Sequence, residues 1–474
     1  MTIRTRIAPS PTGIAHLGTA YIAMRNLALA KQGKGQFLIR IEDTDRERQV
    51  EGAVEVIFDA MKWLNLPNDE GPNVGGPHAP YTQSERLAIY KKHAEELLEN
   101  DKAYYCFCTK ERLDEVRAGQ QARKELPRYD KFCRIIQLSE AKKRVEAGEK
   151  YVIRLKVPEN GVTVCHDLVR GDVEFQNAGI DDQVLLKSDG YPTYHLAVVV
   201  DDHLMEITHV VRGEEWLSSS PKHILIYEAF GWQLPAFGHL PIIRNKDHSK
   251  MSKRKNDVSI LSHRDKGYLP EAISNFLALM GWSHPEKKEI FSQDEFMQLF
   301  TLERVTATAP VYDIDKLNWL NGMYIRELSN DDLLGRLKPF IPSDCPEALV
   351  PLLIPLIKER LVTLKDFEEL TKFFYRPIVV DKTVLTKKST LAEISLMSSE
   401  TVSSLSKLDE KSWTHEIIEQ QVRLLSEKNG WKPSIYFMTL RSLATGETAT
   451  PPLFETIEVI GKEEVIKRLA NVPA

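Results

Sequence analysis

Two short segments of the chain carry residue types that suit the binding of phosphate groups. The first is residues 8–19, Ala-Pro-Ser-Pro-Thr-Gly-Ile-Ala-His-Leu-Gly-Thr, which follow a strand-like run and precede a helical pattern. Free N–H groups at a helix N-terminus attract anions, and Gly13 and Gly18 let a ligand approach the backbone closely. His16 would donate to a phosphate oxygen on which charge builds up during a reaction. The segment matches neither a Walker loop nor a dinucleotide fingerprint, and alone it is also compatible with a capped surface turn.

The second segment is the basic run Lys250-Met251-Ser252-Lys253-Arg254-Lys255. Five of the ten residues from 246 to 255 are basic, in a chain whose formal net charge is −5. The neighbouring Ser and Asn residues favour a loop over a helix face, and a basic loop of this kind can close over a polyphosphate. A solvated basic loop is the alternative interpretation of the run by itself.

A fold must bring these segments together, and the spacing of apolar residues predicts one. Over the first 65 residues, strand-like runs at 5–8 and 37–41 flank a helical pattern at 21–31, as in a βαβ unit. The alternation lapses from about residue 101, and strand-like runs resume at 184–186 and 196–200, where they would complete the interrupted sheet. Amphipathic helices dominate beyond Tyr324. We therefore expect an α/β, Rossmann-like parallel-sheet domain, interrupted by an insertion and followed by an all-α C-terminal region.

Composition limits the class of protein. A length of 474 residues indicates about three domains, and 42% hydrophobic with 28% charged residues is typical of globular chains. The 63 basic and 68 acidic residues give no global positive field, so any site for a polyanion is a local patch. Five sparse cysteines favour a reducing compartment. No signal-peptide pattern and no apolar run of ~20 residues occurs, so we expect a cytoplasmic protein with no membrane partner.

Together, His16-Leu17-Gly18-Thr19 and Lys250-Met251-Ser252-Lys253-Arg254 resemble the paired His-x-Gly-His and Lys-Met-Ser-Lys-Ser motifs of class I aminoacyl-tRNA synthetases. Thr19 and Arg254 depart from the residues common at those positions. Five further segments, residues 6–13, 40–46, 189–194, 200–203 and 212–216, resemble bacterial glutamyl-tRNA synthetases. The resemblance covers residues 1 to about 330 in register and continues more loosely through the helical C-terminus.

The resemblance implies a substrate and the residues that hold it. Glutamate carries two carboxylates and one ammonium, so Arg6 and Arg212 would bind carboxylates and Glu42 would face the ammonium. The family places six residues around the amino acid: Arg6, Ala8, Ser10, Glu42, Tyr194 and Arg212. Six residues would bind ATP: His16, Gly18, Glu215, Trp216, Lys250 and Lys253. Mg²⁺ would be held largely by the phosphates of ATP. Each residue alone is compatible with a purely structural role, and their ordered coincidence favours the site.

The implied reaction has two in-line steps and needs no protein nucleophile. The α-carboxylate of L-glutamate attacks the α-phosphate of ATP to give glutamyl-adenylate, and the glutamyl group then passes to the terminal adenosine of tRNA. Catalysis is positioning plus charge stabilisation, for which His16, Lys250 and Lys253 are the expected catalytic residues.

The resemblance also implies a division of the chain. Residues 1–100 and 181–238 would form the two halves of the catalytic domain, and residues 101–180 an insertion that binds the acceptor end. Residues 239–325 would form a stem-contact domain with the Lys-Met-Ser-Lys-Arg loop, and residues 326–474 an α-helical anticodon-binding domain of two subdomains. The partner would be tRNA(Glu), with tRNA(Gln) left open, and Arg360 would read the last anticodon base. The sequence shows no long exposed apolar stripe that would predict an oligomer, so we expect a monomer.

The insertion also carries a cluster of candidate zinc ligands. Cys106, Cys108 and Cys133 are three thiols, and some relatives complete this pattern with a histidine at the position where Ile135 stands. Tyr129 could then be the fourth ligand of a zinc ion, with Cys165-His166 as a less favoured donor. Three buried apolar cysteines without metal are the alternative, and the sequence leaves both open.

Other functions agree less well with the sequence. A tRNA-base-glutamylating relative would end near the stem-contact region, whereas this chain continues for about 150 helical residues. Glutaminyl-tRNA synthetases end mostly in β-barrels, and a small-metabolite nucleotidyltransferase needs no helical tail. A non-catalytic RNA-binding paralogue is disfavoured because His16, Glu42, Arg212, Lys250 and Lys253 are all present.

Overall fold

The structure is a computed structural model that describes residues 2–249, 251 and 258–473. Lys250 and Lys253 lie outside the described residues. The chain forms two compact units: Met1–His263 with Ile273–Asp313, and Arg264–Ala272 with Ile314–Ala474. Within the described ranges, no helix is both long and apolar enough to cross a membrane.

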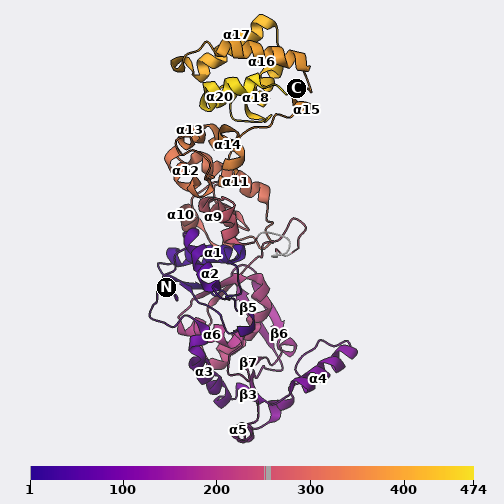
Figure 1. Ribbon diagram of the computed structural model, residues 1–474. Helices are drawn as coiled ribbons and strands as arrows, with labels where there is room; N and C mark the ends of the chain where they lie inside the picture. The colour runs from indigo at the N-terminus through magenta and orange to yellow at the C-terminus, as the bar shows by residue number, and fades with distance from the viewer. Residues whose placement is uncertain (1, 250, 252–257, 474) are drawn as a thin grey trace. The chain divides into compact units, whose positions relative to one another are not determined.

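The first unit begins with the predicted βαβ arrangement (Figure 1). Strand β1 (Arg4–Ile7) pairs in parallel with β2 (Gln36–Ile39), and helix α1 (Leu17–Gln32) connects them. Strand β1 is buried along its whole length, and its arginines point into a polar network described below. The predicted parallel-sheet unit is confirmed.

A second parallel pair continues this layer. Strand β8 (His209–Gly213) pairs with β9 (Ala236–Leu240), and they are connected by the 3-10 helix η5 (Glu214–Ser219) and helix α7 (Ser220–Phe230). The backbone N–H of Thr208 donates to the carbonyl of Arg4 at 3.0 Å, which joins the start of β8 to β1. The hairpin of β5 (Val162–Asp167) and β6 (Gly171–Gln176) extends the sheet beyond β9.

A separate antiparallel sheet is formed by two strands of the interrupting region and one that follows it, in the order β3-β4-β7. Its strands are β3 (Ala103–Cys106), β4 (Val152–Leu155) and β7 (Val184–Leu186). The run at 184–186 is therefore a strand, but it joins this sheet and not the parallel one. The prediction of a strand at 196–200 is wrong, because these residues lie in helix α6 (Tyr194–Leu204), which is buried on most sides. A short apolar run buried all round gives the same sequence signal in a strand and in a helix.

The remaining elements of the first unit surround these sheets. The helices up to residue 179 are η1 (Arg46–Arg48), α2 (Ala53–Trp63), η2 (Gln83–Arg86), α3 (Leu87–Glu99), α4 (Lys110–Ala122), η3 (Phe132–Ile135), α5 (Leu138–Glu146) and η4 (Asn177–Gly179). Those that follow residue 258 are α8 (Ile260–Asp265), α9 (Pro270–Leu279), α10 (Gln293–Leu299) and η6 (Leu302–Arg304), of which α8 and α9 cross the limits of the two units. Helix α10 packs on α1 through carbonyls of Met297 and Phe300, which accept from the Gln32 amide.

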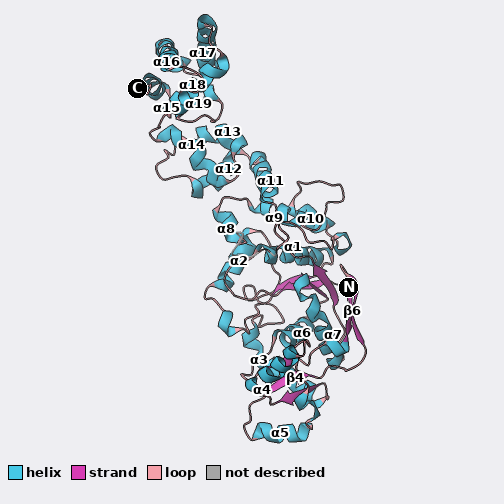
Figure 2. Cartoon of the chain, turned by 90° about the vertical axis from the view of Figure 1, so that its right-hand side faces the viewer, coloured by secondary structure: helices cyan, strands magenta, loops and turns pink. Residues whose placement is uncertain are grey.

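The described residues of the second unit form helices and connecting loops and no β-strand, as Figure 2 also shows by colour. Its elements are α11 (Ile314–Glu327), α12 (Asn330–Leu337), η7 (Lys338–Phe340), α13 (Val350–Ile357), η8 (Lys358–Arg360), η9 (Leu364–Asp366), α14 (Phe367–Tyr375), α15 (Lys382–Leu385), α16 (Leu391–Leu405), η10 (Glu410–Ser412), α17 (His415–Asn429), α18 (Pro433–Thr445), α19 (Leu453–Ile460) and α20 (Lys462–Ala470). Two apolar clusters hold them, one around Leu353 and Phe367 and one around Ile394 and Tyr436. The predicted all-α C-terminal region is confirmed.

Candidate active site

A cavity of about 1120 Å³ lies where β1 and β8 end and α1 begins. In open α/β sheets, ligands bind outside the carboxyl ends of parallel strands, so this is the place where the fold favours a site. Ten of the residues predicted from the sequence line the cavity: Arg6, Ala8, Ser10, His16, Gly18, Glu42, Tyr194, Arg212, Glu215 and Trp216. Met251, the described residue of the Lys-Met-Ser-Lys-Arg segment, also lines it.

His16 is the N-cap of α1, and its ring is fixed by the turn. Its Nδ1 accepts the N–H of Gly18 at 2.9 Å, so in the neutral ring the proton is on Nε2, which is then a donor. A side chain at Gly18 would place a Cβ 3.1 Å from Nδ1 and displace the ring. The backbone of Leu17 donates to Val258 at 2.8 Å, and His16 forms a β-bridge with Ser259. The segment that follows residues 252–257 therefore lies beside the turn.

Arg6 lies in the cavity wall and is held by a buried carboxylate. Its Nε and one terminal nitrogen donate to the two oxygens of Asp202 at 3.0 and 2.9 Å. Asp202 also accepts from Arg40 at 2.8 Å, and Arg40 is fully buried. Burial alone would lower the pKa of Arg6, but the charge of Asp202 and its hydrogen bonds together raise that pKa. Arg6 is thus a charged group whose charge is already matched by the protein.

Glu42 supplies the acidic group of the cavity. Its carboxylate is buried and lies 3.4 Å from Arg40. Burial raises the pKa of Glu42 to about 7, and the nearby Arg40 and Arg6 charges offset only part of that effect. A cation that enters the cavity would favour the ionised form.

Arg212 is surrounded by neutral acceptors. Its Nε donates to His239 Nε2 at 3.0 Å, and one terminal nitrogen contacts Tyr194 Oη and His223 Nδ1, both at 3.1 Å. The other terminal nitrogen donates to Ser220 Oγ at 3.1 Å and to the Trp216 carbonyl at 3.4 Å. The Tyr194 ring packs against Trp216 with centroids 4.3 Å apart.

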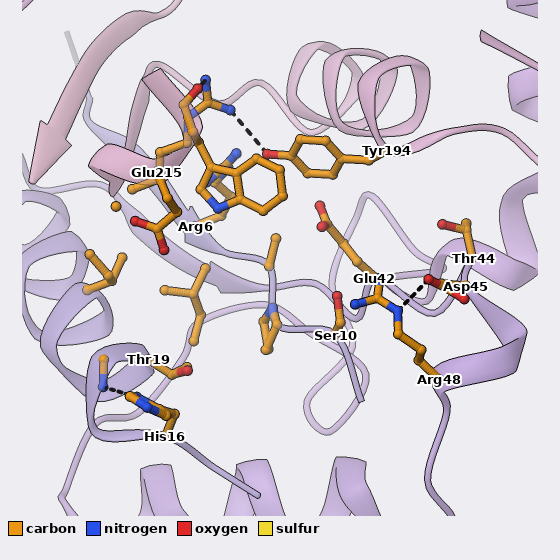
Figure 3. Close-up of a pocket in the computed structure, with 18 of the residues that line it drawn as sticks. Arg6, Ser10, His16, Thr19, Glu42, Thr44, Asp45, Arg48, Tyr194 and Glu215 are labelled. Carbon is orange, nitrogen blue, oxygen red and sulfur yellow. Dashed lines mark hydrogen bonds and ion pairs between the residues drawn. The ribbon is translucent and has the colours of Figure 1, made fainter. Parts of the chain in front are cut away.

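The labelled side chains of the cavity lie in three groups (Figure 3). His16 and Thr19 lie on one side, and Thr44, Asp45 and Arg48 on another, where Arg48 Nε donates to Asp45 at 2.6 Å. Arg6, Tyr194 and Glu215 form the third. Such a cavity can hold a small zwitterion with extra negative charge at one end and an anion at the helix N-terminus at the other.

Sequence reasoning missed the groups that hold the two arginines. Asp202 had a signal, because two adjacent aspartates follow an apolar run and buried charges need partners. His223 and His239 had none, since single histidines in apolar surroundings are common in protein cores. Arg6 and Arg40 are both buried.

A second cluster lies in the interrupting region. The sulfur atoms of Cys106, Cys108 and Cys133 all lie within 4.8 Å of one another, and the last two are 3.5 Å apart. Tyr129 Oη lies 3.4 Å from Cys106 Sγ and 3.6 Å from Cys108 Sγ. The four predicted zinc ligands are thus in one place. Hydrogen bonds from Cys133 and Tyr129 outweigh burial and lower the pKa of Cys106, and Arg112 donates to Cys108 Sγ at 3.3 Å.

Comparison with known families agrees with this geometry. Residues 2–319 match the family model described as the catalytic domain of class I tRNA synthetases (E and Q), and residues 332–473 match the model of an anticodon binding domain. The chain therefore belongs to the class I tRNA synthetases of the E and Q family.

Individual relatives narrow the similarity to one member of the class. The chain is 47% identical to a glutamate–tRNA ligase of Thermus thermophilus over 99% of both chains. It is 45% identical to a glutamate–tRNA ligase of Dehalococcoides mccartyi over 99% of this chain and 96% of the relative. A crystal structure of a glutamate tRNA ligase from Elizabethkingia meningosepticum, in complex with its amino acid, matches with a TM-score of 0.91 and 37% identity over 99% of this chain and 98% of that one. The family and fold class predicted from the sequence are confirmed.

Proposed function

We propose that this protein is a glutamate–tRNA ligase that activates L-glutamate with ATP and transfers it to the 3′ end of tRNA(Glu). The observation that carries the proposal is the charge pattern of the cavity. Two arginines and one buried carboxylate, Arg6, Arg212 and Glu42, match a substrate with two carboxylates and one ammonium.

The phosphate-binding side of the cavity supports activation by ATP. The N-terminus of α1 and the His16 donor line the cavity in which the triphosphate would lie, and Met251, the described residue of the Lys-Met-Ser-Lys-Arg segment, lines the same cavity. In this proposal Lys250 and Lys253 stabilise charge on the α-phosphate and the leaving pyrophosphate. Mg²⁺ would be held mainly by ATP oxygens, as is usual for this small hard cation. Glu215 and Trp216 would contact the nucleotide.

We also propose that the chain binds tRNA along several regions. Residues 101–180 would hold the acceptor end, 239–325 the stem and 326–474 the anticodon, with 1–100 and 181–238 as the catalytic halves. Arg360 is exposed, and both burial and the Arg360 charge lower the pKa of Arg441. Two guanidinium groups so close together favour an anionic partner such as RNA, which supports a role of Arg360 at the anticodon.

Charging of tRNA tests the function. ATP–pyrophosphate exchange with L-glutamate is measured with and without tRNA(Glu) and tRNA(Gln), and charging of each tRNA follows. We expect exchange and charging with tRNA(Glu); charging of tRNA(Gln) as well would identify a broader form of the enzyme. No activity with either tRNA would contradict the proposal and favour a non-catalytic RNA-binding paralogue or a base-modifying relative. The proposal further implies a monomeric enzyme located in the cytoplasm, where its tRNA substrate is used.

We propose that Cys106, Cys108, Tyr129 and Cys133 hold a structural zinc ion. In a tetrahedral site with Zn–S of about 2.3 Å and Zn–O of about 2.0 Å, S···S and S···O separations are about 3.8 and 3.5 Å. The separations of 3.5, 3.4 and 3.6 Å are close to these values. Arg112 beside Cys108 would balance the thiolate charge.

Metal analysis of the purified protein tests the zinc proposal. We expect about one zinc per chain, and Cys108→Ser should lose most of it. Cys345→Ser is the matched control, because Cys345 is a buried thiol of the second unit. A purified wild-type chain that contains no zinc and takes up none from added zinc salts would contradict the site.

A further inference from the structure

We propose that His223 and His239 are positioning residues that set the preference for glutamate over glutamine. They act as neutral acceptors that hold the Arg212 guanidinium in place without matching its charge. This inference rests on the proposed function and specifies how the same cavity tells an acid from an amide.

The two arginines of the cavity differ in how their charge is balanced. Arg6 donates twice to the Asp202 carboxylate, and Arg40 shares that carboxylate. Arg212 is buried, with an exposed fraction of 5%, but it has no ion pair with a carboxylate among the described residues. If the carboxylate of glutamate is replaced by the amide of glutamine, little attraction is lost at Arg6, because Asp202 already balances its charge. At Arg212 the same replacement leaves a buried positive charge without a negative partner. Discrimination between acid and amide is therefore assigned to Arg212.

The contacts of Arg212 use neutral groups on every nitrogen. A guanidinium has five N–H donors, and five neutral acceptors lie within hydrogen-bond distance of them, so a substrate carboxylate would bind by replacing or sharing one of these contacts: His239, His223, Tyr194, Ser220 and the Trp216 carbonyl. The two histidines come from different elements, His239 from β9 and His223 from α7. They hold the guanidinium from two directions, so it cannot turn without losing one of them.

Each histidine is also fixed in the tautomer that accepts from Arg212. His239 Nδ1 lies 2.6 Å from the Asp167 carboxylate and donates its proton there, which leaves Nε2 free of a proton toward Arg212. His223 accepts with Nδ1, so its proton is on Nε2, 3.1 Å from His195 Nδ1. Burial lowers the pKa of both rings, the Arg212 charge lowers both further, and the Asp167 carboxylate offsets only part of the effect at His239. Neither ring adds positive charge or a carboxylate to the site.

A pair of isosteric variants separates the effect of charge from that of shape. His223→Gln offers a neutral oxygen acceptor to Arg212, and His223→Glu offers a carboxylate of almost the same size. Charging of tRNA(Glu) is measured at saturating ATP with glutamate varied and glutamine as competitor. We expect H223E to raise the KM for glutamate at least tenfold more than H223Q does, and to reduce the preference over glutamine by a similar factor. The KM for ATP should be the same in both variants.

Controls distinguish this inference from a packing effect and from failure of the proposed function. His209→Gln is a matched control on β8, where His209 contacts Thr208 and not Arg212. If the buried glutamate prevents folding, Ser220→Asp and Ser220→Asn repeat the comparison at another neighbour of Arg212. Equal glutamate KM values and equal preference in the charged and neutral variants would overturn the inference alone. A wild-type chain that does not charge tRNA with glutamate would overturn the proposed function, and this inference with it.

Discussion

The cavity of the first unit and the helical second unit are stabilised by different interactions. Around the cavity, charged side chains are buried and meet one another, as Arg6, Arg40, Asp201 and Asp202 do. In the second unit the buried side chains are mostly apolar, and ion pairs such as Arg376 with Asp344 lie near the surface.

This difference agrees with the ligand that we propose for each region. A small charged substrate needs donors held at fixed positions, and buried ion pairs fix them at a cost in desolvation. A large polyanion such as tRNA needs exposed cations on a stable helical surface, which apolar helix packing provides. We therefore expect changes in the buried network to affect amino-acid recognition, and changes of exposed basic residues to affect RNA binding.

The largest expected effect is on stability, from removal of the charge of Asp202. Asp202→Asn leaves Arg6 and Arg40 without their shared carboxylate, and loss of one partner of a buried ion pair costs about 3–5 kcal/mol. Urea denaturation followed by tryptophan fluorescence measures the change. Asp344→Asn, in an ion pair at the surface of the second unit, should change the free energy of unfolding little. Equal effects of the two substitutions would remove the contrast between the regions.

The next effect is on rate, at the N-terminus of α1. His16→Ala removes a donor that is fixed by its contact with Gly18, and loss of one such donor lowers kcat by about 100-fold. Single-turnover activation of glutamate measures it, and the KM for glutamate should change little because His16 lies on the phosphate side. His166→Ala, on an exposed side chain of β5, is the control. A variant with normal kcat would exclude His16 from catalysis.

A smaller effect is expected from pH, through Glu42. Its pKa of about 7 means that this carboxylate, which we propose faces the substrate ammonium, is mostly ionised at pH 8 and mostly protonated at pH 6. The KM for glutamate should therefore rise about tenfold as the pH falls from 8 to 6. Glu42→Gln should raise the KM at pH 8 and abolish this dependence. A wild-type KM that does not change over this range would contradict the assignment of Glu42 to the ammonium.

Local patterns in the sequence predict much of the fold. Strands β1 and β2 are short runs buried along most of their length, next to turn residues, and the C-terminal helices have a periodicity of 3.6 residues, so these elements are found from local pattern. The helix at residues 196–200 cannot be found in this way, because a helix buried on most sides has no polar face that would show its period. The cavity residues were found from ordered motifs that resemble a family. The groups that hold them were not, since Arg6 and Asp202 are 196 positions apart and only the fold brings them together.

The most direct test of the division between the two regions is a double-variant cycle on tRNA(Glu) charging. Tyr194→Phe removes a hydroxyl that accepts from Arg212, and Arg360→Gln removes an exposed charge of the second unit. We predict that Tyr194→Phe raises the KM for glutamate but not for tRNA, that Arg360→Gln raises the KM for tRNA but not for glutamate, and that the effects add in the double variant. A change in the KM for tRNA caused by Tyr194→Phe, or in the KM for glutamate caused by Arg360→Gln, would contradict the division of glutamate and tRNA recognition between the two regions.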